Sequence, residues 1–160
     1  MALKEARWSI VKRRARELTK NYSSPPIPVF EIAEQFGVDV IFTDFGSNSD
    51  VVAGFCDFKE KQIVVNDDLK FGRKMFTIAH ELGHWILHKE FFESDPESYT
   101  VFPRFQNPKK NPFEQEANCF AAQLLVPVHL LTPVKTAGVS RLADIFCVSR
   151  EMMEFRLKNA

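Results

Sequence analysis

Two histidines in this chain have the spacing of a metal site. His80 and His84 stand four residues apart in the segment His-Glu-Leu-Gly-His, and Glu81 lies between them. On an α-helix the two imidazoles project from one face, one turn apart, so both can bind a single divalent ion such as Zn²⁺. Glu81 flanks that ion, and we expect it to be the catalytic base that takes a proton from a water made acidic by the metal. The spacing therefore predicts hydrolysis of peptide bonds with one Zn²⁺ per chain.

The residues around this motif predict a buried helix. Apart from the motif itself, the positions from Phe76 to Leu87 are almost all apolar. Two buried histidines need polar partners, and a shared metal supplies one. Gly83 costs about 1 kcal/mol relative to Ala inside a helix, which indicates that another element or the metal comes close here. Two surface histidines on a polar helix are the alternative, and the apolar surroundings argue against it.

A catalytic zinc site needs a third protein ligand and a position left open for water. We expect this ligand on a second apolar helix that begins at Phe113. Glu114 and Glu116 both compete for the role, but residues two apart do not share a helix face. Glu114 and Asn118 are four apart and do share one. Glu114 is therefore predicted to be the third metal ligand, Asn118 to orient one of the histidines from behind, and Glu116 to be an acid at the helix N-terminus or the rim.

The two remaining histidines are weaker candidates. No histidine follows His84 at the spacing of the metzincins. His88 lies near the end of the helix, so we expect it to support the site or to pack. His129 stands alone between two prolines, and a structural role is expected for it.

These residues are expected to lie in an α+β fold with a small antiparallel or mixed sheet and short C-terminal helices. Helices are predicted at residues 3–20, 29–36, 69–88 and 113–126. Strands are predicted at residues 38–42, 51–58 and 62–65. The expected helix caps are Asn66, Asp67 and Asp68 for the long helix and Ser140 and Ser149 for the last two helices.

We expect a single domain over residues 1–160, with its core at 25–135. The segment 139–158 has a helix-turn-helix rhythm, but its basic and acidic residues nearly balance, which favours packing or a partner over DNA. Residues 90–112 are rich in proline and aromatic residues and are predicted to form a long loop that could cover the zinc. Within that loop, Tyr99 or Arg104 could stabilise a developing oxyanion. The strand at 51–58, if it lies at an edge, could hold an extended substrate through main-chain hydrogen bonds.

Composition favours a soluble cytoplasmic protein. The chain has 21 Lys and Arg against 21 Asp and Glu, so its formal net charge is zero, which gives no general attraction to nucleic acid or to an acidic membrane. Its three cysteines are an odd number without a C-x-x-C pair, which fits a reducing compartment. We find no signal-peptide pattern and no apolar run long enough to span a bilayer.

Together the motifs resemble those of the ImmA/IrrE metallopeptidase family. The resemblance is carried by the run from Phe76 to His88 and by the run from Glu114 to Pro127. The strand and cap at 63–66 and the Pro-x-x-Glu-Ile-Ala segment at 28–33 fit as well, and the resemblance extends from about residue 5 to residue 157.

This resemblance implies a helical, zincin-like domain with a gluzincin-like site. In such a site His80, His84 and Glu114 hold zinc, and Glu81 is the base. Relatives in bacteria and their mobile elements cleave helix-turn-helix repressors, so the implied function is that of a zinc-dependent endopeptidase that derepresses genes. The implied substrate is a helix-turn-helix repressor of the Xre or ImmR type, and neither direct nucleic-acid binding nor membrane association is expected.

Two further points remain expectations. No separate N-terminal DNA-binding module and no long C-terminal sensor domain is recognised, so the chain is interpreted as the peptidase unit alone. The alternative function is that of a non-enzymatic regulator that binds DNA or a partner. Its metal would be structural and closed by a fourth protein ligand, for example His88 or Glu116.

Overall fold

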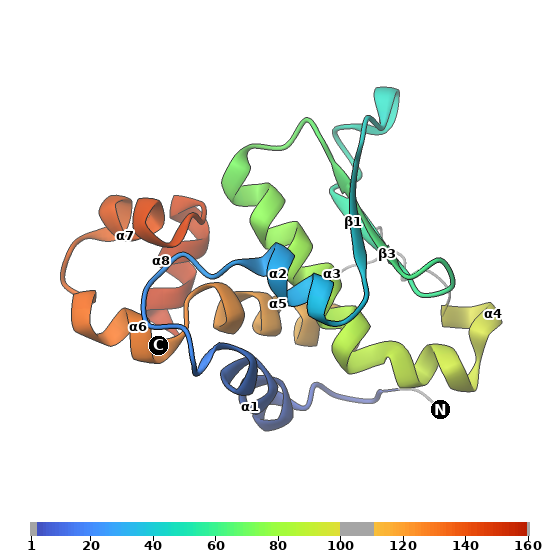
Figure 1. The fold of residues 1–160 in the computed structure, drawn as a ribbon, viewed down its shortest axis with the longest axis horizontal. Helices are drawn as coiled ribbons and strands as arrows, with labels where there is room; N and C mark the ends of the chain where they lie inside the picture. Colours follow the sequence, from blue (N-terminus) through green and yellow to red (C-terminus); the bar gives the residue numbers. More distant parts are fainter. Residues whose placement is uncertain (1–2, 100–110, 160) are drawn as a thin grey trace.

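Helix α3 runs through the middle of the fold, and the other elements pack around it (Figure 1). The computed structural model describes residues 3–99 and 111–159. Its helices are α1 (Trp8–Thr19), α2 (Val29–Gln35), α3 (Phe71–Ser94), α4 (Pro96–Tyr99), α5 (Pro112–Leu125), α6 (Val128–Leu131), α7 (Val139–Phe146) and α8 (Arg150–Lys158). Its strands are β1 (Asp39–Thr43), β2 (Gly54–Asp57) and β3 (Gln62–Asn66), and single 3-10 turns lie at Gly46–Asn48 and Thr132–Val134.

The three strands form a mixed sheet in the order β1-β3-β2. β1 pairs in parallel with β3, where Val40 lies opposite Ile63. β2 pairs antiparallel with β3 and places Cys56 opposite the same residue. β3 is central, and its last four residues are buried, whereas the edge strand β1 has exposed positions. The predicted α+β class with a small mixed sheet and short C-terminal helices is confirmed.

Helices α3 and α5 approach each other closely. A Cβ atom added to Gly83 would lie 3.0 Å from Cδ1 of Phe120 and 3.3 Å from its Cβ. Ala117 and Ala121 of α5 are fully buried, and their small side chains allow the two helices to come together. The expectation that another element comes close at Gly83 is therefore confirmed, and α5 is that element.

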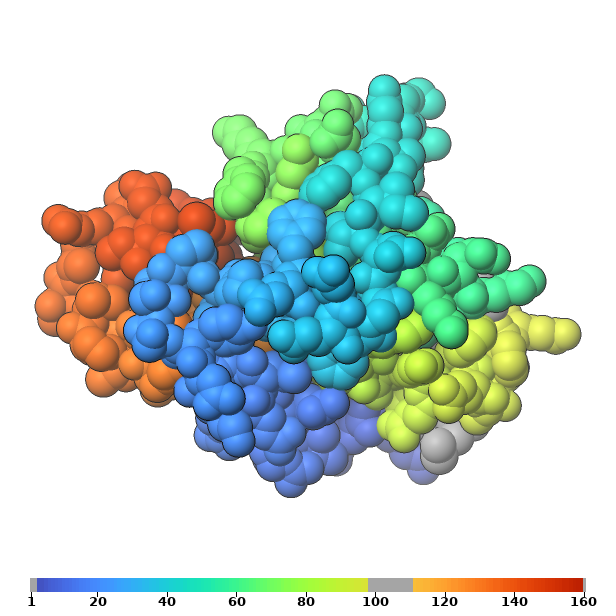
Figure 2. Space-filling view, viewed as in Figure 1, coloured from blue at the N-terminus to red at the C-terminus, as the bar shows by residue number. Residues whose placement is uncertain are grey.

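The remaining helices cover the other sides of this pair. α1 lies against α5 and buries Val11 and Ala15. The C-terminal helices α7 and α8 gather at one end of the molecule, as the orange and red surface in Figure 2 shows. The two helices contact each other, and Leu142 and Met153 are buried. Among the described residues no single helix is long and apolar enough to cross a membrane, while the bent pair Pro112–Leu125 and Val128–Val134 meets that test by length and composition.

Several predicted boundaries differ from the structure. α1 begins at Trp8 rather than near residue 3, because the backbone of Arg7 is held by a carboxylate of α5. β2 begins at Gly54, since the preceding Val51 lies in a turn and is exposed. α3 continues six residues beyond His88 to Ser94, because the buried Phe91 extends its apolar face into the segment that was predicted as loop.

Two of the predicted caps are also wrong. Asn66 does not cap α3; its amide donates to the carbonyls of Ser49 and Val52, and Lys70 is the N-cap residue. Ser140 lies inside α7, whose N-cap residue is Gly138. The cap at Ser149 is confirmed, because its hydroxyl accepts a hydrogen bond from the backbone N–H of Met152.

Candidate metal centre

His80 and His84 occupy successive turns of α3 and are both buried. Their ring centroids are 4.9 Å apart. The side chains of His80, Glu81 and His84 bring one possible ligand atom each within 4.8 Å of one another, and this cluster is buried. The three side chains, which the sequence spacing placed near one another on a helix, therefore lie together in the fold.

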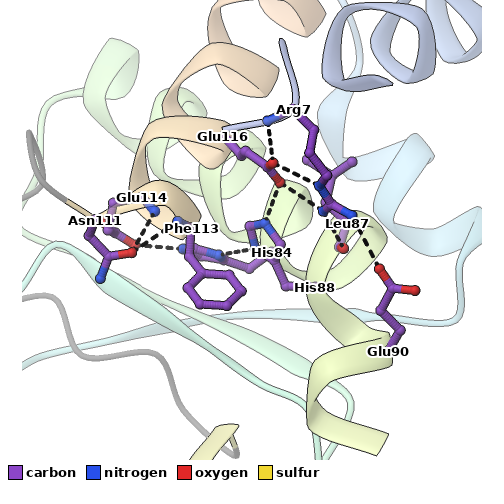
Figure 3. A network of polar contacts seen from close by, with 9 residues as sticks. All are labelled: Arg7, His84, Leu87, His88, Glu90, Asn111, Phe113, Glu114 and Glu116. Carbon is purple, nitrogen blue, oxygen red and sulfur yellow. Dashed lines mark hydrogen bonds and ion pairs between the residues drawn. The ribbon is translucent and has the colours of Figure 1, made fainter. Parts of the chain in front are cut away.

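Glu114 reaches both imidazoles from the first turn of α5. Its Oε1 atom lies 2.7 Å from Nε2 of His84, and its Oε2 atom lies 3.4 Å from Nε2 of His80. The start of α5 is fixed locally, because the side chain of Asn111 accepts hydrogen bonds from two backbone N–H groups of the first turn, as Figure 3 shows. Glu114, predicted from helix geometry alone, thus lies where a third ligand is needed.

Asn118 lies one turn after Glu114 and contacts the other side of the same cluster. Its Oδ1 atom is 2.8 Å from Nδ1 of His80. The amide of Asn118 therefore contacts His80, one of the two histidines that it was predicted to orient. No signal in the sequence decided between the two histidines.

The donor atoms of this cluster suit a cation. An amide oxygen only accepts, so Nδ1 of His80 carries the proton and its Nε2 atom keeps a lone pair. That lone pair faces the carboxylate of Glu114, which also only accepts. A proton or a metal ion must lie between such groups, and two imidazoles with one carboxylate are a frequent ligand set for catalytic zinc. The residues present therefore fit a bound Zn²⁺.

Electrostatics keep Glu114 ionised. Burial acts to raise the pKa of its carboxyl group, but the interactions with the His80 and His84 rings outweigh burial and lower the pKa below its usual value. A carboxylate in this state can bind a cation without first losing a proton.

Within the cluster, Glu81 lies next to His80. Its Oε2 atom is 3.9 Å from Nε2 of His80, whereas Glu114 is closer and contacts both imidazoles. Its side chain is buried. The predicted division between a ligand at Glu114 and a base at Glu81 stays a prediction.

His88 and Glu116 lie behind His84. Nδ1 of His88 is 2.8 Å from Nδ1 of His84, and its Nε2 atom is 2.9 Å from Oε1 of Glu116. The carboxylate of Glu116 also accepts hydrogen bonds from the backbone N–H and from Nε of Arg7, at 2.8 and 2.9 Å (Figure 3). Burial lowers the pKa of His88 to about 4.

Glu116 was predicted to be an acid at the helix N-terminus or the rim, and the structure excludes the rim. Its side chain is 0% exposed, because α5 is packed between α3 and α1 and is covered on both sides. Burial acts to raise its pKa, but the hydrogen bonds from Arg7 and His88 outweigh it and lower the pKa to about 2. Sequence reasoning missed Arg7 altogether, since no local pattern connects residues 109 positions apart.

The other predicted functional residues lie elsewhere. Nε2 of His129 is 2.9 Å from the backbone carbonyl of Tyr22, far from the cluster in sequence, which fits a structural role. Arg104, the other residues of 100–110 and the side chain of Tyr99 lie outside the described residues, so the predicted oxyanion and loop roles stay predictions.

The fold and this cluster together indicate a domain of the metallopeptidase type, and comparison with known proteins agrees. Residues 33–158 match the IrrE N-terminal-like domain, a peptidase family, and the chain belongs to this family. It is 29% identical over 131 residues to an uncharacterized immunity region protein 2 of Bacillus phage phi105, covering 80% of this chain and 75% of that protein.

A similar fold occurs in a solved structure. A Mycobacterium tuberculosis transcriptional regulator aligns with a TM-score of 0.64 and 17% identity, covering 91% of this chain. The alignment covers 45% of the regulator, so this chain spans less than half of that protein's length. At this identity the likeness supports the fold alone.

Proposed function

We propose that this protein is a zinc-dependent endopeptidase that cleaves a helix-turn-helix repressor and so switches genes on. The observation that carries the proposal is the convergence of His80, His84 and Glu114 from two helices, with Glu81 beside them. One Zn²⁺ held by the first three side chains would lower the pKa of a water and polarise the scissile carbonyl. Membership of a peptidase family supports the reaction class.

In this proposal Glu81 moves the proton. Its carboxylate accepts a proton from the attacking water as the new carbon–oxygen bond forms, and then donates it to the amine nitrogen as the carbon–nitrogen bond breaks. Its burial keeps bulk water from competing for that proton. Asn118 holds the His80 ring in the orientation that points Nε2 into the cluster.

The sheet offers a place for an extended substrate. β2 is an edge strand in the order β1-β3-β2. It lies against α3, since a Cβ atom added to Gly54 would be 2.8 Å from Cγ2 of Thr77, one turn before His80. A peptide paired with the outer edge of β2 would run along the helix that carries the motif.

The repressor as substrate is supported by the family and by the phage relative, which is named for an immunity region. Direct DNA binding has less support. Within α8, the guanidinium of Arg156 is buried, and the exposed Arg150 pairs with Glu154. Both arginines are thus engaged within the protein, and DNA phosphates would have to compete for them.

A structural metal closed by His88 or Glu116 also has little support. These two side chains contact each other, and His88 contacts His84 at Nδ1, whereas Glu114 contacts His84 at Nε2. They therefore lie on the opposite side of the His84 ring from the cluster.

The test is cleavage of a repressor encoded beside the gene. Purified repressor is incubated with the zinc-loaded protein and followed by intact mass spectrometry. We expect one or a few defined cuts with wild type, none with Glu81→Gln, and wild-type cleavage with Glu93→Gln, which changes an exposed carboxylate of the same helix. Equal cleavage by wild type and Glu81→Gln would rule out the proposal.

A further inference from the structure

Arg7, Glu116, His88 and His84 form one continuous line of contacts, which we call the support network (Figure 3). Arg7 precedes α1, Glu116 lies on α5, and the two histidines lie on α3. Each link measures 2.9 Å or less. We propose that Arg7, Glu116 and His88 are positioning residues that hold His84 in the one tautomer able to bind the metal. This inference rests on the proposed function, because it takes His84 to be a metal ligand.

The first link decides the state of Glu116. Arg7 presents only N–H donors to the carboxylate: its backbone N–H and Nε donate to Oε2, and Nη2 donates to Oε1. A guanidinium paired in this two-pronged way stabilises an ionised carboxylate. Oε1, which also faces His88, is therefore an acceptor.

The second link decides the tautomer of His88. Because Oε1 of Glu116 accepts, the nitrogen that faces it, Nε2 of His88, must carry the proton. In a neutral imidazole the other nitrogen is then an acceptor, so Nδ1 of His88 presents a lone pair to His84. The rings of Phe91 and Phe113 pack against His88 and keep it in place.

The third link decides which nitrogen of His84 binds the metal. Its Nδ1 atom lies 2.8 Å from the lone pair of His88 and must donate, which leaves the lone pair of His84 on Nε2. Nε2 is the atom that faces Glu114. The support network therefore fixes the proton of His84 on Nδ1, as Asn118 fixes that of His80. It differs in that it starts at Arg7, which precedes the first helix.

Glu116→Gln is the variant that tests the support network most directly. The carboxamide has one oxygen and one NH₂ group. With its oxygen in the Oε2 position it accepts from two of the three Arg7 donors, the backbone N–H and Nε, and the NH₂ group takes the Oε1 position, where Nη2 loses its acceptor. The NH₂ group then faces Nε2 of His88, which must accept, so the proton of His88 moves to Nδ1 and opposes the proton of His84. We expect zinc affinity to fall by about 10- to 100-fold, the usual effect of losing a group that supports a metal ligand.

Glu90→Gln is the matched control. Glu90 is the other carboxylate that contacts Arg7, at 3.4 Å, but it is exposed and does not touch the histidines. Zinc affinity, measured by competition with a chromophoric chelator, is expected to change by less than about twofold. Equal losses in Glu116→Gln and Glu90→Gln, or no loss in either, would overturn the proposal.

Histidine NMR tests the proton positions independently of activity. In protein labelled with ¹⁵N at histidine, we expect a proton on Nδ1 of His84 and on Nε2 of His88, and a shift of the His88 proton to Nδ1 in Glu116→Gln. A proton on Nδ1 of His88 in the wild type would overturn the support network.

The outcomes separate this inference from the proposed function. If the wild type binds no zinc, the proposed function fails. The position of the His88 proton, measured by NMR, still shows whether the support network is correct. If the wild type binds zinc but Glu116→Gln binds it equally well, the support network fails alone. If Glu116→Gln does not fold, the histidine tautomers of the wild type test the support network instead. A second test compares His88→Gln with His88→Phe. The glutamine keeps one acceptor and one donor, so His88→Gln should retain more zinc affinity than His88→Phe.

Discussion

Gly83 of α3 lies directly against Phe120 of α5, and a methyl group in its place would require Phe120 to shift by a few tenths of an ångström. This contact sets the distance between the helix that carries His80 and His84 and the helix that carries Glu114. The geometry of the candidate site therefore depends on a residue that has no polar group.

Gly83→Ala tests this dependence. Alanine favours the helix by about 1 kcal/mol, but its Cβ atom would lie 3.0–3.3 Å from three atoms of Phe120, and overpacking costs about 1–3 kcal/mol. We expect a net loss of about 1 kcal/mol in the free energy of unfolding, measured with urea on metal-free protein, and weaker zinc binding. Combining it with Phe120→Leu should recover part of both losses, and strictly additive effects would contradict the contact.

Metal content tests the roles of the site residues. Wild-type protein is expected to bind one Zn²⁺ per chain, and His84→Ala or Glu114→Ala to lose most of it. Glu81→Gln should keep the metal, because the glutamate is the base rather than a ligand. His129→Ala, which changes a histidine whose ring contacts the backbone carbonyl of Tyr22, is the control. Elemental analysis after dialysis gives the result, and loss of zinc from Glu81→Gln but not from Glu114→Ala would reverse the assigned roles.

The sequence predicts those parts of the site that depend on residue spacing within a single helix. His80, Glu81 and His84 share one helix, and Glu114 and Asn118 share another, so spacing alone placed each group correctly within its own helix. The contact between the two helices was anticipated from their apolar faces and from Gly83. The structure brings all five side chains to one cluster.

What sequence did not predict depends on contacts between distant segments. The pairing of Arg7 with Glu116 joins positions 109 apart, and no pattern of spacing marks it. The extension of α3 to Ser94 depends on the burial of Phe91 between elements that only the fold brings together. Ser140 resembled a helix cap locally, but the N-cap residue of α7 is Gly138, two residues earlier.

Cysteine reactivity is expected to follow burial. Burial raises the pKa of the Cys56 thiol far above its usual value, and it also raises the pKa of the Cys119 thiol. Cys147 is partly exposed. In native protein treated with iodoacetamide, we expect Cys147 to react first, Cys119 more slowly and Cys56 only after unfolding, because the thiolate is the reactive form.

Peptide mass spectrometry of samples quenched over time measures these three rates. Protein unfolded in urea is the control, in which all three cysteines should react alike. Native Cys56 reacting as fast as Cys147 would show that β2 does not pack as described.

Arg156 is expected to stabilise the C-terminal end of the fold through hydrogen bonds rather than an ion pair. Its side chain is 1% exposed, and its Nε and Nη2 atoms donate to the carbonyl of Val126 and to Oε1 of Gln123. Among the described residues no carboxylate pairs with it, and burial lowers its pKa. The guanidinium therefore holds α8 against the end of α5.

Arg156→Ala removes these bonds and leaves both a cavity and an unsatisfied carbonyl. We expect a loss of about 2–4 kcal/mol in the free energy of unfolding. Arg150→Ala is the matched control, because Arg150 is an exposed arginine of the same helix whose pair with Glu154 is worth about 0–1 kcal/mol. Urea unfolding of the two variants at the same pH and zinc concentration compares them, and a similar small loss in both would mean that α8 is not anchored through Arg156.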